Sequence, residues 1–237
     1  MENLIDLAAA YRILAEHGVI DAYGHVSVRS ARDPDRYYLA KHLAPELVMP
    51  GDMIEYDLDS TPLDANGRES VRERFIHGEI YKARPEVMSV VHNHSPSVVP
   101  FSITSQPLRA IFHMAAFIGH GVPNYEIRDF EEGTDLLVKT PYLGQALAKT
   151  LKDCPAALMR GHGAVVVGES LPRAVGRSLY LELSAKMQMQ AMIISRPGAK
   201  LMTLDDKEVA ASVPNQNYNR AWPMWRARAL MQMGIKE

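Results

Sequence analysis

Hydrophobic and polar positions alternate along the chain with a helical period in some segments and an extended period in others. From residue 3 to residue 17 apolar side chains recur at helical spacing, and Gly18 is placed to end that helix. Val26 and Val28 alternate with polar residues, which predicts a strand over residues 23–29. By the same criteria we expect further strands over residues 37–40, 53–58, 87–92, 156–159 and 164–167, and further helices over residues 70–83, from about Ser95, over 142–152 and over 171–194.

The order of these elements predicts the fold class. Helices and strands alternate throughout, and the sequence contains no repeat, low-complexity stretch or linker. We therefore expect one α/β domain over residues 1–237, with a mixed, mainly antiparallel central sheet between helices.

Composition narrows the class of protein. A chain of 237 residues that is 47% hydrophobic can bury a substantial core, and a formal net charge of −2 favours neither nucleic acid nor an anionic membrane as a partner. No apolar run approaches the length of about 20 residues that a membrane span needs. The start of the chain is amphipathic and acidic, unlike a signal peptide, and Cys154 is the only cysteine. A lone cysteine excludes an intrachain disulfide, so we expect a cytoplasmic protein.

A pair of histidines at the end of a predicted strand indicates a metal site. His92 and His94 follow an apolar run, and a strand directs alternate side chains to the same face, so both imidazoles can point at one place while Asn93 faces away. His162 lies between Gly161 and Gly163, directly before another apolar run. Glycine allows unusual backbone angles and close approach to a bound group. Three neutral imidazoles with an open position form the ligand set of a catalytic zinc-type site.

Three segments, taken in order, resemble the class II aldolase and adducin superfamily. They are Gly24-His25-Val26-Ser27-Val28-Arg29, Val91-His92-Asn93-His94 and Gly161-His162-Gly163, and the resemblance runs from about residue 3 to residue 195. It implies a three-layer α/β/α domain with one divalent metal ion per subunit on His92, His94 and His162. The metal is Zn²⁺ or Mn²⁺, with Fe²⁺ or Co²⁺ as alternatives. It also implies a homotetramer whose active sites lie between subunits, and a tail of about residues 215–237 that either covers a neighbouring site or packs as a helix.

Glu73 has two interpretations. By position it matches the family's catalytic carboxylate, which takes part in proton transfer. By local pattern, Ser70 and Glu73 fit a capping box that satisfies the amides of a helix beginning there.

Departures from the sugar-phosphate enzymes of the family indicate a different substrate. Where those enzymes carry small donors for a phosphate, this chain has His25, the segment Lys41-His42-Leu43, and Val71. A phosphate site needs several small donors and close backbone approach, so a phosphorylated sugar is disfavoured. Basic side chains near the expected pocket suit carboxylates instead. The expected substrate-binding residues are His25, Arg29, Lys41, His42 and Arg72.

His113 is the second expected catalytic residue. It stands where aldolases of the family carry a tyrosine that donates a proton from a neighbouring subunit. An imidazole titrates near neutrality and can transfer a proton readily. A buried structural histidine is the alternative.

With these departures the chain resembles the metal-dependent decarboxylase branch of the superfamily more than its aldolases, which implies a metal-dependent carbon–carbon lyase. We expect a decarboxylase of a small anionic substrate, a hydroxylated aromatic or pyridine carboxylic acid of the kind met in aromatic catabolism. One alternative is an aldolase that cleaves a hydroxy-keto acid or a sugar phosphate. Another is an adducin-like binding module without chemistry, although such a domain would be expected to have lost the three histidines and the glutamate.

Overall fold

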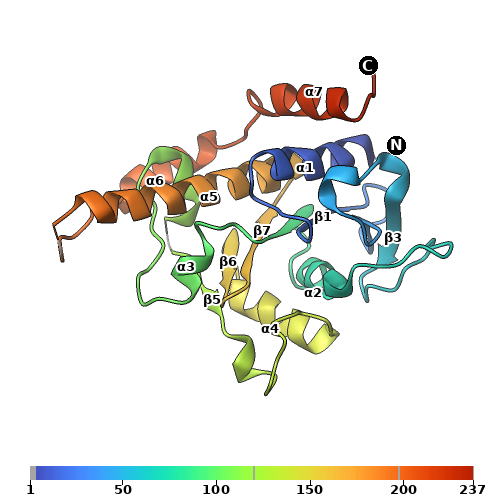
Figure 1. Ribbon diagram of the computed structural model, residues 1–237, viewed down its shortest axis with the longest axis horizontal. Coiled ribbons are helices and arrows are strands. Elements are labelled where there is room, and N and C mark those ends of the chain that lie inside the picture. Colours follow the sequence, from blue (N-terminus) through green and yellow to red (C-terminus); the bar gives the residue numbers. More distant parts are fainter. Residues whose placement is uncertain (1–3, 120, 197, 237) are drawn as a thin grey trace.

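A seven-stranded sheet forms the centre of the molecule (Figure 1). The computed structural model describes residues 4–119, 121–196 and 198–236. The strand order is β3-β2-β1-β4-β7-β6-β5, and every neighbouring pair is antiparallel except β5 and β6. The strands are β1 (His25–Arg29), β2 (Arg36–Ala40), β3 (Met53–Asp57), β4 (Ser89–Asn93), β5 (Asn124–Tyr125), β6 (Ala156–Met159) and β7 (Gly163–Gly168).

Helices cover both faces of this sheet (Figure 1). On one face lie α1 (Leu4–Glu16) and α5 (Leu171–Ile194), and on the other lie α2 (Phe75–Ala83) and α4 (Pro141–Leu151). The predicted three-layer α/β arrangement with a mixed, mainly antiparallel sheet is therefore confirmed. The remaining helices are α3 (Val99–Ser102), α6 (Asp206–Ser212) and α7 (Trp222–Gln232).

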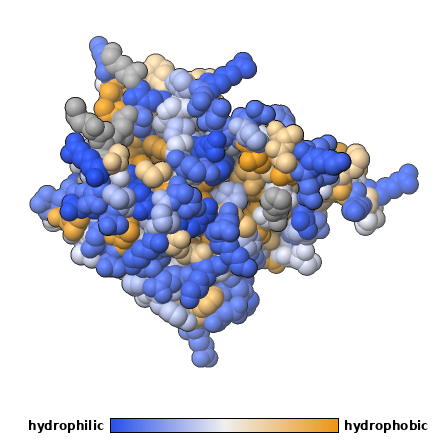
Figure 2. Space-filling view, turned by 180° about the vertical axis from the view of Figure 1, so that it is seen from behind, coloured by the Kyte–Doolittle hydropathy of each residue, from blue (hydrophilic) through white to orange (hydrophobic). Residues whose placement is uncertain are grey.

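The end of α5 extends beyond the sheet (Figure 1). Its last residues carry exposed apolar side chains. Ile193 is 80% exposed and Ile194 is 87% exposed, and Met192 is also exposed. We call these three residues the α5-end patch. Seen from behind, hydrophobic residues lie among hydrophilic ones on the side of the molecule that holds this end (Figure 2). Within the described residues, no helix combines the length and the apolar character needed to cross a membrane.

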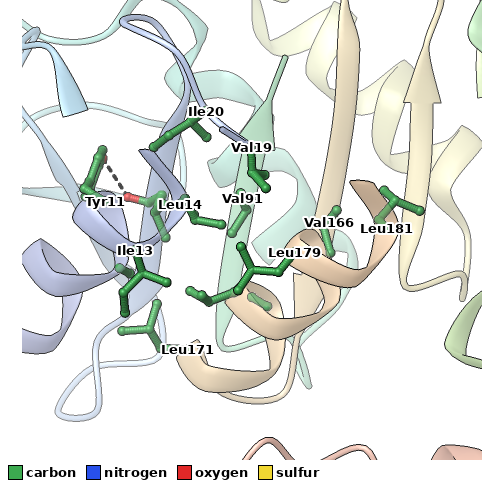
Figure 3. Close-up of a cluster of buried hydrophobic side chains, with 14 of the residues drawn as sticks. Tyr11, Ile13, Leu14, Val19, Ile20, Val91, Val166, Leu171, Leu179 and Leu181 are labelled. Atoms are coloured by element: carbon green, nitrogen blue, oxygen red, sulfur yellow. Dashed lines mark hydrogen bonds between the residues drawn. The ribbon is translucent and has the colours of Figure 1, made fainter. Parts of the chain in front are cut away.

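The larger hydrophobic core lies between the sheet and the helices α1 and α5. Ile13 and Leu14 from α1 meet Val91 of β4 and Leu179 of α5 in one cluster of buried side chains (Figure 3). Burying a side chain of this size contributes about 1.5–3 kcal/mol. The hydroxyl of Tyr11 donates a hydrogen bond of 2.8 Å to the carbonyl of Val26, which ties α1 to β1 next to the first histidine motif.

Two predicted helices differ from the structure. The helix expected from Ser70 begins only at Phe75, after a short 3₁₀ turn over Arg72–Arg74, because Ser70 pairs with Lys41 in an isolated β-bridge. The helix expected from about Ser95 is reduced to the single turn of α3. The helices over residues 142–152 and 171–194 and the strands were predicted to within a few residues, while the two-residue strand β5 was not. Residue 3, the expected start of the first helix, lies outside the described residues.

The C-terminal segment packs as a helix on its own chain. Trp225 of α7 is 7% exposed, and its ring meets His17 at the end of α1 edge-on at 6.1 Å. Arg226 forms an ion pair with Asp6 of α1. Of the two expected roles for this tail, packing is the one that these contacts support.

Candidate metal centre and substrate pocket

The sheet itself brings two of the histidine motifs together. His92 lies in β4, directly opposite His25 of β1 and Val165 of β7, and His94 follows immediately after β4 ends. β4 is a central strand that lies between β1 and β7. Strands on both of its edges therefore hold its end in place. The rings of His25 and His92 lie 4.9 Å apart between centroids.

Three imidazole nitrogens converge on one point. His92 Nε2 and His94 Nε2 are 3.2 Å apart, and His162 Nε2 and His94 Nε2 are also 3.2 Å apart. His92 is fully buried, and the other two are partly buried. The predicted grouping of His92, His94 and His162 is therefore what the structure contains.

Each of these rings has its other nitrogen committed to an oxygen acceptor. His92 Nδ1 donates to the carbonyl of Ala164 at 3.2 Å, and His162 Nδ1 donates to the carbonyl of Leu136 at 2.9 Å. His94 Nδ1 donates to the carboxylate of Asp21 at 3.0 Å. With the hydrogens on Nδ1, all three Nε2 lone pairs face the common point. Such acceptors orient metal-binding histidines and raise their basicity.

The glycines beside His162 provide an unusual backbone angle and a close approach of two strands, as the sequence suggested. Gly161 has a φ of +64°, in the left-handed region that favours glycine. A Cβ on Gly163 would lie 1.9 Å from the carbonyl oxygen of Asn93. The strands β4 and β7 can therefore approach closely enough to bring His162 beside His94 only when residue 163 has no side chain.

Glu73 completes the group from another element. Its Oε2 lies 3.6 Å from His92 Nε2 and 3.6 Å from His162 Nε2, and its Oε1 accepts a hydrogen bond of 2.8 Å from the amide of Val138. The capping-box interpretation is wrong: residue 71 precedes the 3₁₀ turn in an extended conformation, no side chain caps the turn, and Ser70 Oγ accepts a hydrogen bond from Tyr56 instead.

Burial favours the uncharged forms of Glu73, His92 and His162. It raises the pKa of Glu73 to about 7, although the Val138 amide acts in the opposite direction. Burial and the neighbouring imidazoles hold the pKa of His92 well below its usual range and lower that of His162 to about 4. The Glu73 carboxyl lies within ion-pair distance of the imidazoles of His92 and His162, yet the pKa of each of these three groups is shifted toward the uncharged form. The arrangement is thus a set of converging lone pairs rather than an ion pair.

These residues fit a divalent cation. Ligands about 2.0–2.1 Å from a tetrahedral zinc ion lie roughly 3.3 Å from each other, close to the spacing of the Nε2 atoms. Converging lone pairs without hydrogens between them repel one another unless a cation lies among them. The predicted need for a metal therefore agrees with the donor set, while imidazoles alone do not distinguish zinc from manganese, iron or cobalt.

A pocket of about 670 Å³ opens beside this group, and His94 and Glu73 are among the residues that line it. Three basic side chains, Lys41, His42 and Arg72, are among the residues that line it. Lys41 pairs with Asp52 at 2.7 Å, and His42 lies 3.5 Å from Glu69 at the rim. The full lining comprises Tyr11, Ala22, Tyr23, Gly24, His25, Lys41, His42, Leu43, Ala44, Leu47, Val71, Arg72, Glu73, His94 and Leu137.

Arg29 does not belong to this pocket, so its expected role in substrate binding is wrong. It lies at the opposite end of β1 from His25, and its guanidinium donates to the backbone carbonyls of Val87 at 3.0 Å and Tyr81 at 2.7 Å. The cation also lies 4.7 Å from the centre of the Tyr81 ring. Arg29 therefore fastens α2 to the sheet.

His113 also lies away from the pocket of its own chain. It begins a 3₁₀ segment over His113–Ile118, its side chain is exposed, and its carbonyl accepts a hydrogen bond from Gln216. The exposed imidazole is not the buried structural histidine of the alternative interpretation. Its proposed function from a neighbouring subunit stays a prediction.

Several residues of the site were missed from the sequence. Asp21, Leu136 and Val138 orient His94, His162 and Glu73, but they lie in loops far along the chain from the groups that they hold. Leu136 has a φ of +70°, a strained value for leucine, which turns its carbonyl toward His162. His77, buried in α2, was missed although its helical spacing from Tyr81 was visible.

Comparison with known proteins places these features in a wider group. The sequence profile of the Class II Aldolase and Adducin N-terminal domain matches residues 5–189. Decarboxylase tropJ of Talaromyces stipitatus is 36% identical, over 90% of this chain and 88% of that protein. A 3,4-dihydroxyphthalate decarboxylase of Rhodococcus jostii is 27% identical, over 85% of this chain and 84% of that protein. The structure of an L-fuculose 1-phosphate aldolase from Glaciozyma antarctica superposes with a TM-score of 0.76 at 22% identity, covering 98% of this chain and 89% of that one, and so supports the fold.

Proposed function

The chain belongs to the class II aldolase and adducin family, and we propose that it is a metal-dependent decarboxylase of a non-phosphorylated, hydroxylated aromatic or pyridine carboxylic acid. The resemblance inferred from the sequence is confirmed. So is the expected carbon–carbon lyase of the decarboxylase branch, since relatives over most of the chain are named decarboxylases. The observation that carries the proposal is the convergence of the three Nε2 atoms beside a pocket lined by basic side chains.

In the proposed site, His92, His94 and His162 hold one divalent ion per subunit through Nε2. When bound there, the ion supplies Lewis acidity, which stabilises negative charge on a substrate oxygen as carbon dioxide departs. Lys41, His42 and Arg72 supply positive or hydrogen-bonding groups that attract an anionic substrate toward the ligands. Bulky residues at 41–43 leave little room for the close backbone contacts of a phosphate.

Glu73 and His113 would each carry out one of the two proton transfers of the reaction. Glu73 Oε2 lies 3.6 Å from the ligand nitrogens of His92 and His162, so it would be placed to take the proton of a substrate hydroxyl there. The bond between the substrate carbon and its carboxylate carbon then breaks, and its electron pair stays on the substrate. A proton must reach that carbon, and His113 of a neighbouring subunit is our candidate donor.

This role requires another copy of the chain, and we propose a homotetramer with active sites between subunits. The α5-end patch, with Ile193 and Ile194 exposed in the single chain, supports an oligomer because monomers seldom leave such side chains grouped in water. We also propose that the protein acts in the cytoplasm.

The proposal is tested by measuring carbon dioxide released from a panel of hydroxylated aromatic, pyridine and aliphatic dicarboxylates. We expect release from at least one hydroxylated aromatic or pyridine acid. His92→Ala should remove both this activity and the bound metal, because one of three ligands is lost. His17→Ala, which changes an exposed histidine at the end of α1, should alter neither.

Two outcomes would contradict the proposal. If a hydroxy-keto acid yields an aldehyde or a pyruvate-like fragment and no acid yields carbon dioxide, the protein is an aldolase. If the purified protein holds little metal and takes up none on titration, it is a binding module without chemistry.

A further inference from the structure

A row of buried polar groups leads away from the metal ligands into the core. His25 Nδ1 lies 2.7 Å from His77 Nε2, His77 Nδ1 lies 2.6 Å from Ser27 Oγ, and Ser27 Oγ lies 2.7 Å from the hydroxyl of Tyr81. All four side chains are at most 2% exposed. We call these four residues the buried relay.

Periodicity explains how the relay forms. His25 and Ser27 are two residues apart on β1 and share a face of the sheet. His77 and Tyr81 are four residues apart on α2 and share a face of that helix. Because α2 packs on this face of the sheet, the two pairs interleave.

The end of the relay fixes the direction of its hydrogens. Among the described residues, Ser27 is the only hydrogen-bond acceptor found for the Tyr81 hydroxyl. Burial raises the pKa of Tyr81, so its hydroxyl keeps its hydrogen and needs an acceptor for it. A buried hydroxyl without an acceptor costs about 1–3 kcal/mol, so Tyr81 donates to Ser27.

The remaining bonds follow in sequence. Ser27 Oγ accepts from Tyr81, and among the described residues His77 Nδ1 is the one acceptor left for the hydrogen of Ser27, so Ser27 donates to His77 Nδ1. His77 then carries its hydrogen on Nε2 and donates it to His25 Nδ1. His25 must therefore carry its hydrogen on Nε2, the nitrogen that the relay leaves free.

That nitrogen has no protein partner. His25 Nε2 is buried and makes no hydrogen bond within the described part of the chain, yet His25 lines the substrate pocket. A ring nitrogen of His25 also lies within 4.8 Å of a Glu73 oxygen and a His92 nitrogen. A nitrogen that carries a hydrogen cannot bind a metal, so this fourth imidazole is not a fourth ligand.

We propose that His25 donates its Nε2 hydrogen to an anionic oxygen of the substrate, and that Ser27, His77 and Tyr81 are positioning residues that hold His25 in this tautomer. This inference rests on the proposed function and assigns one substrate contact within it. A fixed donor in a buried site favours a ligand with an acceptor oxygen there, and it disfavours an analogue without one because the N–H is then left unpaired.

The first test needs no substitution and no turnover. Neutron diffraction from crystals of the zinc-loaded protein shows where the hydrogens lie. We expect deuterium on His25 Nε2 and His77 Nε2, and none on His25 Nδ1. A bare His25 Nε2, or zinc bound to it, would overturn the proposal.

The second test measures binding of zinc and of salicylate, a hydroxylated aromatic carboxylate, by calorimetry. His25→Phe should leave zinc affinity unchanged and weaken salicylate binding about tenfold or more, whereas His25→Gln, which keeps a side-chain N–H donor, should recover part of the loss. Tyr81→Phe should weaken salicylate binding with zinc affinity intact, because the relay can then reverse. His17→Phe, outside the pocket, is the matched control.

The outcomes separate the two proposals. Loss of zinc binding in His25→Phe would make His25 a ligand, and unchanged salicylate binding would remove it from substrate contact; either result overturns the inference. Absence of carbon dioxide release by the unaltered protein would overturn the proposed function, and the neutron and binding results would still stand.

Discussion

At the scale of single residues, Glu73 combines burial with proximity to three imidazoles. Its pKa in the folded protein is raised from 4.5 to about 7, so the folded state prefers the protonated carboxyl. For a group raised in this way, the stabilising contribution is complete below the unfolded pKa and is lost as pH rises through the folded pKa. In the metal-free protein, the ionised Glu73 should therefore destabilise the fold above about pH 7.

Glu73→Gln removes this titration and keeps an oxygen that can accept from Val138. Relative to the parent, the metal-free variant should gain roughly 3 kcal/mol in free energy of unfolding as pH rises from 4.5 to 8, and the loaded variant should keep its metal but lose most turnover. Urea unfolding across this range measures the difference. Glu132→Gln, at an exposed position, should show no such trend. A difference that stays constant with pH would mean that Glu73 is already ionised in the fold.

Single residues also show how much of the site can be predicted from the sequence. His92, His94 and His162 could be identified because alternation along a strand and flanking glycines are local patterns. Asp21 could not, since it lies 73 residues from the histidine that it orients. Arg29 was misassigned for the same reason: its sequence position is near the pocket motif, but the opposite end of a five-residue strand faces different neighbours.

At the scale of elements, the metal centre depends on how closely β4 and β7 approach. Gly163→Ala would place a Cβ 1.9 Å from the Asn93 carbonyl oxygen, and backbone cannot move aside as a flexible side chain can. We expect a loss of about 1–3 kcal/mol in free energy of unfolding and a weaker zinc affinity, because the ends of both strands carry ligands. Gly51→Ala is the control, since its Cβ would meet nothing within 4 Å. Unchanged zinc affinity in Gly163→Ala would show that the ligands tolerate a shift of the strands.

Helices and strands were predicted correctly where their residues are strongly buried. They were predicted wrongly where contacts with residues far along the chain determine the local structure. Valine-rich strands and the long helix α5 follow from periodicity, and their bounds agree closely with expectation. The start of α2 does not, because the β-bridge between Ser70 and Lys41 keeps residue 70 extended. Lys41 lies outside residues 70–83, so no pattern within that range could indicate the bridge.

At the scale of the whole molecule, a single chain brings together the three proposed metal ligands and Glu73 but not the second proposed proton carrier. His113 is exposed and does not line the pocket of its own chain. The proton transfer proposed for His113 therefore has to take place at the site of another copy. A closed ring would satisfy this for every subunit, because each head-to-tail contact repeats until the ring closes.

Mixing two inactive variants tests this arrangement. In tetramers reassembled at random from equal amounts of His113→Ala and Glu73→Gln, about one quarter of the sites between neighbouring subunits would contain both intact residues. Activity should therefore return to about a quarter of that of the unaltered protein. Each variant reassembled alone is the control and should stay inactive. If both residues act within one chain, every mixed site lacks one of them and no activity returns. Full activity in His113→Ala alone would remove this histidine from the reaction, and an active monomer by light scattering would exclude the ring.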